Sequence, residues 1–260
     1  MAVNKVVDSF DEAVKDFFDG ATVLIGGFGT PGGCPSYLMQ ALGRQGAKDL
    51  TIVCNNVGFG AELMQVAAQF TTVPDWWYDG GQLASNRQVK KAIAAFPVLA
   101  SPLMVAPFEK QLRAGEVEIE IVPQGTLAER IRAAKAGIGA FYCPVGPGTI
   151  VEKGKEVKVI DGRKHVLEYP IKADFALIRA FKADRLGNLV YRGTSRTFNA
   201  TMAGAAKVTI VEVDEVVEVG EFDPESVVTP AIYVDRVAVR PEEGRTKFVQ
   251  KIGKEEQLQK

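Results

Sequence analysis

A glycine-rich segment, GGFGTPGG at residues 26–33, is the part of this sequence whose composition most directly suggests chemistry. It continues the apolar run TVLIG (22–26) and precedes a helix-like segment. Glycines let the backbone approach a ligand closely, and their N–H groups can bind an anion or a developing oxyanion. The glycines of this segment are therefore candidates for holding an anion or a carbonyl oxygen.

Two nucleotide-binding motifs can be tested against this segment. Gly27, Gly29 and Gly32 satisfy G-x-G-x-x-G, but a dinucleotide site also needs its third glycine in the first helical turn and an acid ending the next strand. Pro31 interrupts the segment, and the helix pattern starts only at residue 36. No Gly-Lys-Ser/Thr follows, which excludes a Walker loop. A second interpretation of the segment is a tight strand-to-helix turn that binds no ligand.

Two adjacent amides follow the next apolar run. Asn55 and Asn56 come directly after LTIVC (50–54), where a dinucleotide site would carry its acid. Carboxamides can orient a carbonyl or a carboxylate without adding charge. We therefore expect Asn55 and Asn56 to lie beside the glycine segment, at the carboxyl edge of one sheet.

The composition excludes several classes of function. The chain has 260 residues, 47% of them hydrophobic and 24% charged, with a net charge of −1. No overall basic field would attract nucleic acid or an anionic membrane, and the longest apolar runs are far too short for a membrane span. The N-terminus becomes acidic before any apolar core, which argues against a signal peptide.

Cysteine and histidine are too sparse for a metal site. Cys34, Cys54 and Cys143 show no C-x-x-C spacing, and an odd, sparse count is typical of a reducing cytoplasm. His165 is the only histidine, and its context GRKHVLEY indicates an exposed hairpin strand and a structural role. We expect no metal.

Helix and strand patterns alternate along the chain, and this is what must position the glycines and amides. Ser9 with Glu12 and Thr126 with Glu129 have capping-box spacing, and Ser36 is expected to cap a helix over 35–46. Val14, Phe17 and Phe18 are expected on one helix face, and Leu38, Met39 and Leu42 are expected to face inward; Gly20, Gly46 and Gly137 are the predicted helix stops. The further predicted elements are a helix at 59–70, strands at 117–122, 140–143, 174–181, 188–191 and 207–213, a hairpin around DGRK (161–164), and a small-residue helix at 197–206.

This alternation predicts an α/β fold with an open, mostly parallel sheet, helices on both faces and a small β-hairpin excursion. We expect one domain over residues 1–245 and a charged C-terminal tail at 246–260. The least regular stretch, 71–109, is rich in Pro, Gly and aromatic residues and is predicted to be a variable insert or a lid.

The sequence resembles the α subunits of family I coenzyme A transferases. The segment DGATVLIGGFGTPGGCP matches their signature at Asp19, Gly20, Gly26, Gly27, Phe28 and Gly32, although the proline arrives one position late, at Pro35. Long stretches such as VEIEIVPQGTLAERIRAAKAGIGAFYCPVGPGTIVEKGKEV extend the similarity to succinyl-CoA:3-oxoacid and acetoacetate transferase subunits over nearly all of 9–238, apart from 71–109.

The resemblance implies a fold shared with sugar-phosphate isomerases and a specific division of labour. These enzymes move coenzyme A between carboxylates through a glutamyl-CoA intermediate on a glutamate of the partner β subunit, within Ser-Glu-Asn-Gly. No Glu-Asn-Gly occurs here, and Glu116, Glu118 and Glu120 belong to solvated faces. The chain is therefore expected to contain no catalytic nucleophile and to need a β subunit in a heterodimer or heterotetramer.

The resemblance also assigns binding residues. By this resemblance the coenzyme A site is expected to be lined by Gly26, Gly27, Phe28, Gly29, Thr30, Pro31 and Gly32. The amides of Asn55, Asn56 and Gln124 are expected to face the active-site glutamate or the substrate. Gln124 lies in PQGTLAER at a strand-to-helix junction, with Gly125 and the expected Thr126 cap beside it. An uncapped helix N-terminus there would favour an anion such as a carboxylate. Phe28 either walls the thioester pocket or is a core aromatic.

The sequence thus predicts the cytoplasmic α subunit of a 3-oxoacid-type CoA-transferase, which uses coenzyme A thioesters as substrates and no cofactor. The alternatives are a sugar-phosphate isomerase or CoA-lyase relative, and a non-catalytic ligand-sensing domain built on the same fold. No DNA-binding segment accompanies it, which disfavours a sensor. The donor acyl group and the acceptor acid are not determined by the sequence.

Overall fold

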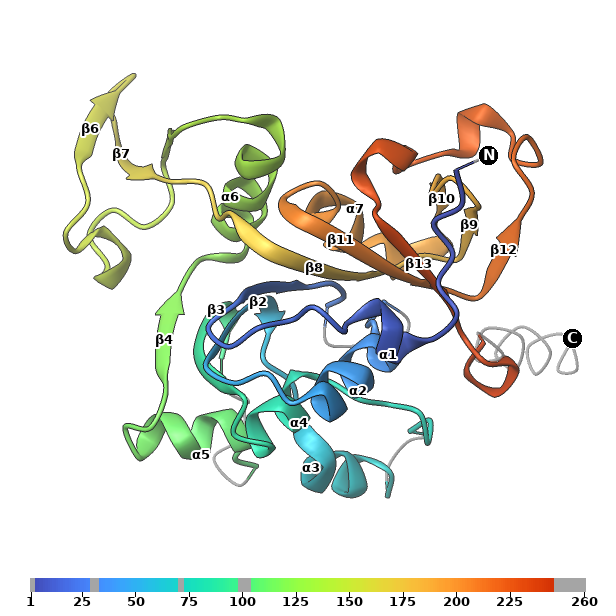
Figure 1. Ribbon diagram of the computed structural model, residues 1–260. Coiled ribbons are helices and arrows are strands. Elements are labelled where there is room, and N and C mark those ends of the chain that lie inside the picture. The colour runs from blue at the N-terminus through green and yellow to red at the C-terminus, as the bar shows by residue number, and fades with distance from the viewer. Residues whose placement is uncertain (1–2, 29–32, 70–72, 98–103, 246–260) are drawn as a thin grey trace, which may run out of the picture.

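The central sheet is parallel throughout, and its strand order reverses next to β1. A computed structural model describes residues 3–28, 33–69, 73–97 and 104–245 (Figure 1). Within these ranges seven strands pair in the order β13-β11-β8-β1-β2-β3-β4. They are β1 (Thr22–Ile25), β2 (Leu50–Asn56), β3 (Val89–Phe96), β4 (Glu118–Ile121), β8 (Ala173–Arg179), β11 (Ala206–Val213) and β13 (Arg236–Val239). The predicted open α/β sheet is therefore confirmed.

Helices cover both faces of this sheet, as the alternating pattern predicted. Below it in Figure 1 lie α1 (Phe10–Ala13), α2 (Ser36–Gln45), α3 (Gly60–Ala67), α4 (Gly80–Ser85) and α5 (Pro107–Arg113). Above it lie α6 (Gln124–Ala136) and α7 (Asn199–Met202). Two separate apolar cores result, because strands such as β1 are buried on both sides.

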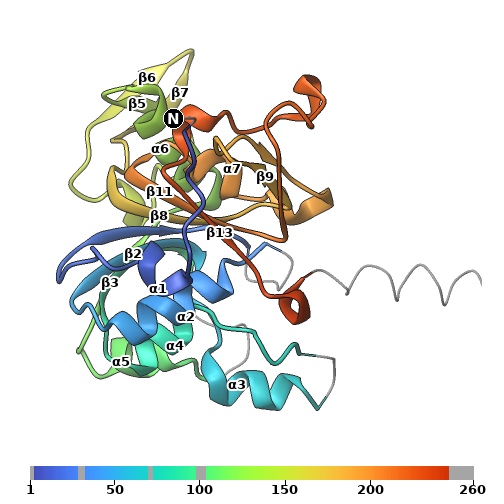
Figure 2. The same ribbon diagram turned by 45° about the vertical axis from the view of Figure 1, so that its right-hand side comes forward.

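The predicted hairpin projects from the body of the molecule. β6 (Val157–Ile160) and β7 (Arg163–Glu168) pair antiparallel, and β5 (Phe141–Cys143) joins β7 to form a three-stranded sheet (Figures 1 and 2). The turn at Asp161 and Gly162 has φ values of 49° and 74°, as a tight two-residue hairpin turn requires. A second small sheet contains β9 (Lys182–Asp184), β10 (Leu189–Val190) and β12 (Glu215–Val217).

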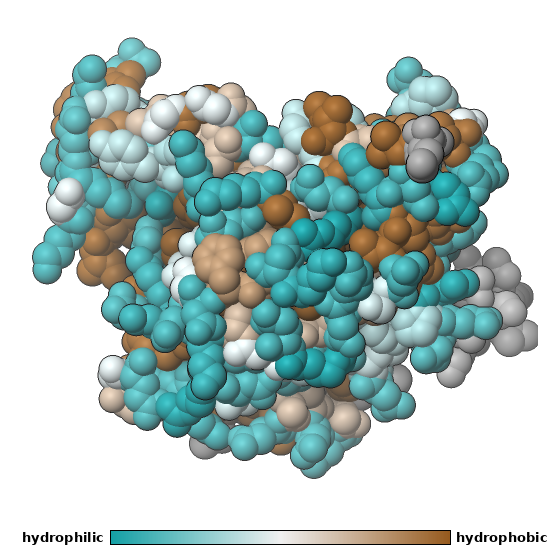
Figure 3. Space-filling model, viewed as in Figure 1, coloured by the Kyte–Doolittle hydropathy of each residue, from teal (hydrophilic) through white to brown (hydrophobic). Residues whose placement is uncertain are grey.

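The surface viewed in Figure 3 is mainly hydrophilic, with smaller apolar patches. One lies over the projecting three-stranded sheet and its connections, where Val145, Ile150 and Val159 are exposed. No helix in the described ranges combines the length and the apolar character needed to cross a bilayer.

The stretch expected to be an insert or lid contributes to the sheet instead. Residues 80–96 form α4 and β3, and β3 pairs between β2 and β4. The VKKAIAAF pattern gives no clear strand prediction, because its charged first half does not resemble a strand buried on both faces. The wider proposal of one domain over 1–245 stays a prediction, and the tail at 246–260 lies outside the described residues.

Helix ends were predicted better than helix starts. Gly46 and Gly137 end α2 and α6 in left-handed conformation, and Leu38, Met39 and Leu42 are fully buried as expected. Ser36, however, does not cap α2: it is the first helical residue and donates to the carbonyl of Tyr78.

Thr126 and Glu129 do not form a capping box either, since α6 already starts at Gln124. In both helices a proline precedes the first helical residue, a position that its restricted φ allows. The expected capping residues, Ser36 and Thr126, therefore lie inside their helices and not before them.

The first helix is shorter than the pattern 9–20 suggested. Ser9 does accept the N–H of Glu12, but α1 ends at Ala13. Val14 and Phe17 are buried, whereas Phe18 is 51% exposed, so the expected common face is wrong at Phe18. Four helical residues cannot sustain a periodic face over three turns.

The N-terminus of α2 is capped from across the sheet by a buried carboxylate. Glu212 on β11 accepts the N–H groups of Tyr37 and Leu38 at 2.9 and 3.0 Å. Arg240, which is 0% exposed, places its Nε 3.3 Å from a Glu212 oxygen and its guanidinium over the rings of Trp76 and Tyr37. This cluster ties β11, β13 and the 74–79 segment to the start of α2.

We predict that Arg240→Met lowers the free energy of unfolding by about 3–5 kcal/mol at pH 8, because it removes a cation that contacts the buried Glu212 carboxylate. Burial raises the pKa of Glu212, and Arg240 opposes that rise. Since a raised folded-state pKa costs stability as pH increases through it, the variant should lose less at pH 5. Urea unfolding at both pH values measures this.

Arg44→Met is the control, because the Arg44–Asp11 pair is exposed and should contribute less than about 1 kcal/mol. Equal losses for the two variants, or a loss at Arg240 that does not change with pH, would contradict the prediction.

Candidate active site

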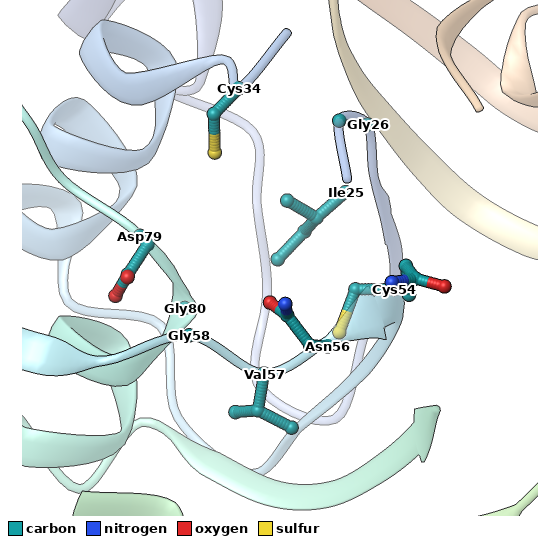
Figure 4. A pocket seen from close by; sticks show the side chains of 11 residues that line it. Ile25, Gly26, Cys34, Cys54, Asn56, Val57, Gly58, Asp79 and Gly80 are labelled. Atoms are coloured by element: carbon teal, nitrogen blue, oxygen red, sulfur yellow. The ribbon is translucent and has the colours of Figure 1, made fainter. Parts of the chain in front are cut away.

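A small pocket opens at the carboxyl ends of β1 and β2, next to the point where the strand order reverses. Open α/β sheets bind ligands at this place. In Figure 4 the side chains of Ile25, Cys34 and Asn56 point toward the middle of the pocket. The lining residues are Ile25, Gly26, Gly27, Cys34, Cys54, Asn55, Asn56, Val57, Gly58, Asp79 and Gly80. The structure therefore brings both predicted asparagines next to the start of the glycine segment.

The two glycines at the start of this segment are required by their neighbours. Gly27 has φ of 95°, and a Cβ there would lie 2.9 Å from the carbonyl oxygen of Gly33. A Cβ on Gly26 would overlap the side-chain oxygen of Asn199. The predicted site residues Gly29, Thr30, Pro31 and Gly32 lie outside the described residues.

The two asparagines face opposite sides of β2, because side chains alternate along a strand. Asn56 shares the pocket side with Cys54 (Figure 4), whereas Asn55 shares the α6 side with Val53. Asn55 is 6% exposed, and its Oδ1 accepts the Nε2–H of Gln124 at 2.9 Å. This hydrogen bond orients the amide and leaves Asn55 Nδ2 to donate elsewhere.

Gln124 and Gly125 begin α6, whose first turn has no side-chain cap. A Cβ on Gly125 would meet nothing within 4 Å, and both residues are exposed. The positive end of a thirteen-residue helix therefore faces solvent next to Asn55. An anion can approach there without displacing a protein group.

Phe28 lies outside the pocket lining and is 43% exposed. Its ring stacks on Phe198, with 6.3 Å between ring centroids and 15° between planes. Phe28 thus shields Phe198 and is not a core aromatic.

Among the described lining residues that the sequence did not predict as site residues, Asp79 is the one with a carboxylate. It is 4% exposed, and its carboxylate accepts N–H groups from Phe59, Gly60 and Gly81 at 2.7–3.1 Å. Burial raises the pKa of Asp79, while these N–H groups act to lower it. The spacing of Asp79 and Gln82, a capping box at the start of α4, was the available signal.

The pocket thiols are not activated nucleophiles. Burial raises the pKa of Cys54 to about 12 and that of Cys34 well above its usual value. The thiolate is the reactive form, so both groups stay protonated and inert near neutral pH.

The arrangement can hold a carbonyl or a carboxylate but supplies no free nucleophile from the described part of the pocket. Both oxygens of Asp79 are occupied by backbone donors. The glutamates of the 116–120 stretch are engaged elsewhere or exposed: Glu116 pairs with Arg87, Glu120 with Arg130, and Glu118 is exposed.

Across residues 3–28, 33–69, 73–97 and 104–245, no three His, Cys, Asp or Glu side chains gather closely enough to hold a metal ion. His165 lies on β7 and bonds through Nδ1 to the carbonyl of Arg163 at 2.8 Å. A backbone carbonyl is neither the acid nor the nucleophile of a catalytic triad, so this contact agrees with a structural role for His165.

Comparison with solved structures supports the fold. An acyl-CoA transferase apoenzyme of Escherichia coli O157:H7 superposes with a TM-score of 0.76 at 23% identity, over 93% of this chain. The chain spans about half of that polypeptide, 48% of its length.

Sequence comparison covers the same region. The family model of coenzyme A transferase matches residues 7–240. The A subunit of 3-oxoadipate CoA-transferase from Pseudomonas putida is 47% identical over 90% of this chain and 93% of its own length. The A subunit of succinyl-CoA:3-ketoacid coenzyme A transferase from Helicobacter pylori J99 is 41% identical over 90% of this chain and 92% of its own length. On these matches, together with a pocket at the carboxyl edge of a parallel sheet, the chain belongs to the coenzyme A transferase family.

Proposed function

We propose that this chain is the α subunit of a heteromeric CoA-transferase that moves coenzyme A between an acyl-CoA and a carboxylic acid. The observation that carries the proposal is a pocket of asparagine amides and glycine backbone whose described residues offer no free nucleophile, because the Asp79 carboxylate in its lining is occupied by backbone N–H groups. A glutamate of a β subunit would complete it.

The proposed reaction proceeds through two exchanges on that glutamate. Its carboxylate attacks the thioester carbonyl, which forms an acyl-glutamyl anhydride and releases the CoA thiolate. The thiolate then attacks the glutamyl carbonyl, which forms the glutamyl-CoA thioester and releases the first acid. The acceptor carboxylate reverses both steps and leaves with coenzyme A.

Our proposal gives the residues of this chain a supporting part in those steps. Asn55 Nδ2 donates to the oxygen that gains negative charge, in the orientation set by Gln124. The bare backbone at Gly26 and Gly27 lets the thioester approach the sheet edge. The open N-terminus of α6 at Gly125, on the same side of β2 as Asn55, holds the carboxylate, and Asn56 lines the pocket on the other side of β2 without adding a fixed charge.

The relatives suggest the substrate class. Their names specify 3-oxoadipate in one case and succinyl-CoA with a 3-ketoacid in the other. We propose succinyl-CoA as the donor and a 3-oxo acid as the acceptor, with coenzyme A thioesters as substrates and no additional cofactor. No observation favours the isomerase, CoA-lyase or sensor alternatives.

The location and the assembly complete the proposal. Cys34, Cys54 and Cys143 are free cysteines, which supports a cytoplasmic location. The relatives are named as A subunits, which supports a heterodimer or heterotetramer with a β subunit.

We predict that the purified chain by itself exchanges no coenzyme A between succinyl-CoA and a 3-oxo acid, because the nucleophile belongs to the partner. Activity should appear when the β subunit is added, and hydroxylamine or borohydride should then trap a glutamyl-CoA thioester on that partner. Assay of the two separate polypeptides and of their mixture measures this. Sustained turnover by the isolated chain would refute the placement of the nucleophile.

We predict that Gln124→Glu in the assembled enzyme slows thioester formation about 10²–10³-fold, the usual effect of losing one oxyanion donor. A carboxylate cannot donate to Asn55 Oδ1, so the Asn55 amide reverses and presents oxygen to the substrate. Single-turnover trapping at saturating succinyl-CoA measures the rate.

Gln65→Glu, at an exposed position of α3, is the matched control for the added charge. It should retain the wild-type rate. If Gln124→Glu also retains it, the proposed orientation of Asn55 has no part in the reaction.

A further inference from the structure

One buried asparagine contacts both ends of the glycine segment. Asn199, the first residue of α7, is 0% exposed. Its Nδ2 donates to the carbonyl oxygens of Gly33 and Ser195, each at 2.9 Å, and its Oδ1 accepts the N–H of Arg179 at 3.0 Å. One amide thus joins the end of β8 to the approach to α2, where Gly33 lies 166 residues from Asn199 in the chain.

The other end of the segment packs on the same amide. Gly26 donates its N–H to the carbonyl of Leu177 on β8 at 2.9 Å, and a Cβ on Gly26 would overlap Asn199 Oδ1. Gly27 in turn lies against Gly33, since a Cβ there would be 2.9 Å from the Gly33 oxygen. The separation of the two ends is therefore set by the Asn199 side chain between them.

The backbone that presents Asn199 is strained. Thr197 has φ of 33°, a conformation that is costly for a β-branched residue. Its Oγ1 lies 3.3 Å from Asn199 Nδ2. Such strain persists only where surrounding contacts enforce it, and it concentrates at functional sites.

We propose that Asn199 is a positioning residue for the transfer reaction: it fixes Gly26 and Gly27 against Gly33 and so sets the shape of the thioester pocket. This role rests on the proposed function. Asn199 is absent from the pocket lining, whereas Gly26, Gly27 and Cys34 belong to it, so Asn199 acts through their backbone.

An amide is needed at position 199 because both its N–H donors and its oxygen acceptor form hydrogen bonds. Nδ2 must donate to two carbonyl oxygens while Oδ1 accepts an N–H. A carboxylate would place negative charge against the oxygens of Gly33 and Ser195, whereas a protonated carboxyl could donate to one of them. The activity of an Asn199→Asp variant should therefore increase relative to wild type as the pH is lowered.

The test is Asn199→Asp in the complex with the β subunit. We expect the rate of thioester formation per assembled complex, at saturating succinyl-CoA, to fall about 10- to 100-fold. A displacement of the reacting groups by about 1 Å typically has an effect of this size. The rate should recover in part at lower pH. Asn188→Asp is the matched control. Asn188 Nδ2 donates to Asp184 in the turn between β9 and β10, so this change likewise replaces a donor by a negative charge that faces an oxygen, and Asn188 is not part of the pocket lining. It should lower stability without changing the rate per complex.

Gly26→Ala is the second variant, because its methyl displaces the same amide without adding charge. It should slow thioester formation with no recovery at low pH. The proposal is overturned if both variants assemble and react at the wild-type rate, if Asn188→Asp is slowed equally, or if neither variant assembles, which would make Asn199 purely architectural. A wild-type complex that forms no glutamyl-CoA thioester would instead overturn the proposed function together with this role.

Discussion

The reversal of strand order between β1 and β8 is the constraint on which the rest of this structure depends. In a parallel sheet each strand needs a crossover, and crossovers that depart in opposite directions leave the carboxyl ends of the two central strands uncovered. The glycine segment leaves β1 at that gap, and β2 ends beside it in two asparagines. The pocket is therefore a consequence of topology, and the residues at its rim decide its chemistry.

Buried polar side chains hold that rim in place from distant parts of the chain. Asp79 binds the N–H groups that follow β2, Glu212 binds those that open α2, and Asn199 joins the ends of the glycine segment. Each of these side chains pairs backbone groups that would otherwise be buried without partners. A buried group left unpaired costs about 1–3 kcal/mol. The asparagine amides at this rim are neutral, so they can hydrogen-bond a carbonyl or a carboxylate without adding a charge of their own.

Much of this arrangement follows from local pattern. The continuous apolar run before Gly26 predicts a strand buried on both faces, and the spacing of Leu38 and Leu42 predicts the face that α2 buries. Gly137 predicts the end of α6, because glycine adopts the left-handed conformation that ends helices. Asn55 at the end of an apolar run predicts an amide at the sheet edge, since parallel strands end along the same side.

The tertiary structure decided what depends on contacts between distant residues. The start of α2 is set by Glu212, 175 residues away, and not by Ser36, because a carboxylate from across the sheet reaches the helical N–H groups. β3 pairs with β2 on one side and with β4 on the other, and these pairings join segments that its own local pattern does not indicate. The sequence by itself determined the elements, the glycine segment and the amides at the sheet edge. Only the fold brought Asn199 to Gly33 and the Asp79 carboxylate, beyond its local capping box, to Phe59 and Gly60, because a hydrogen bond between remote segments leaves no periodic trace in the chain.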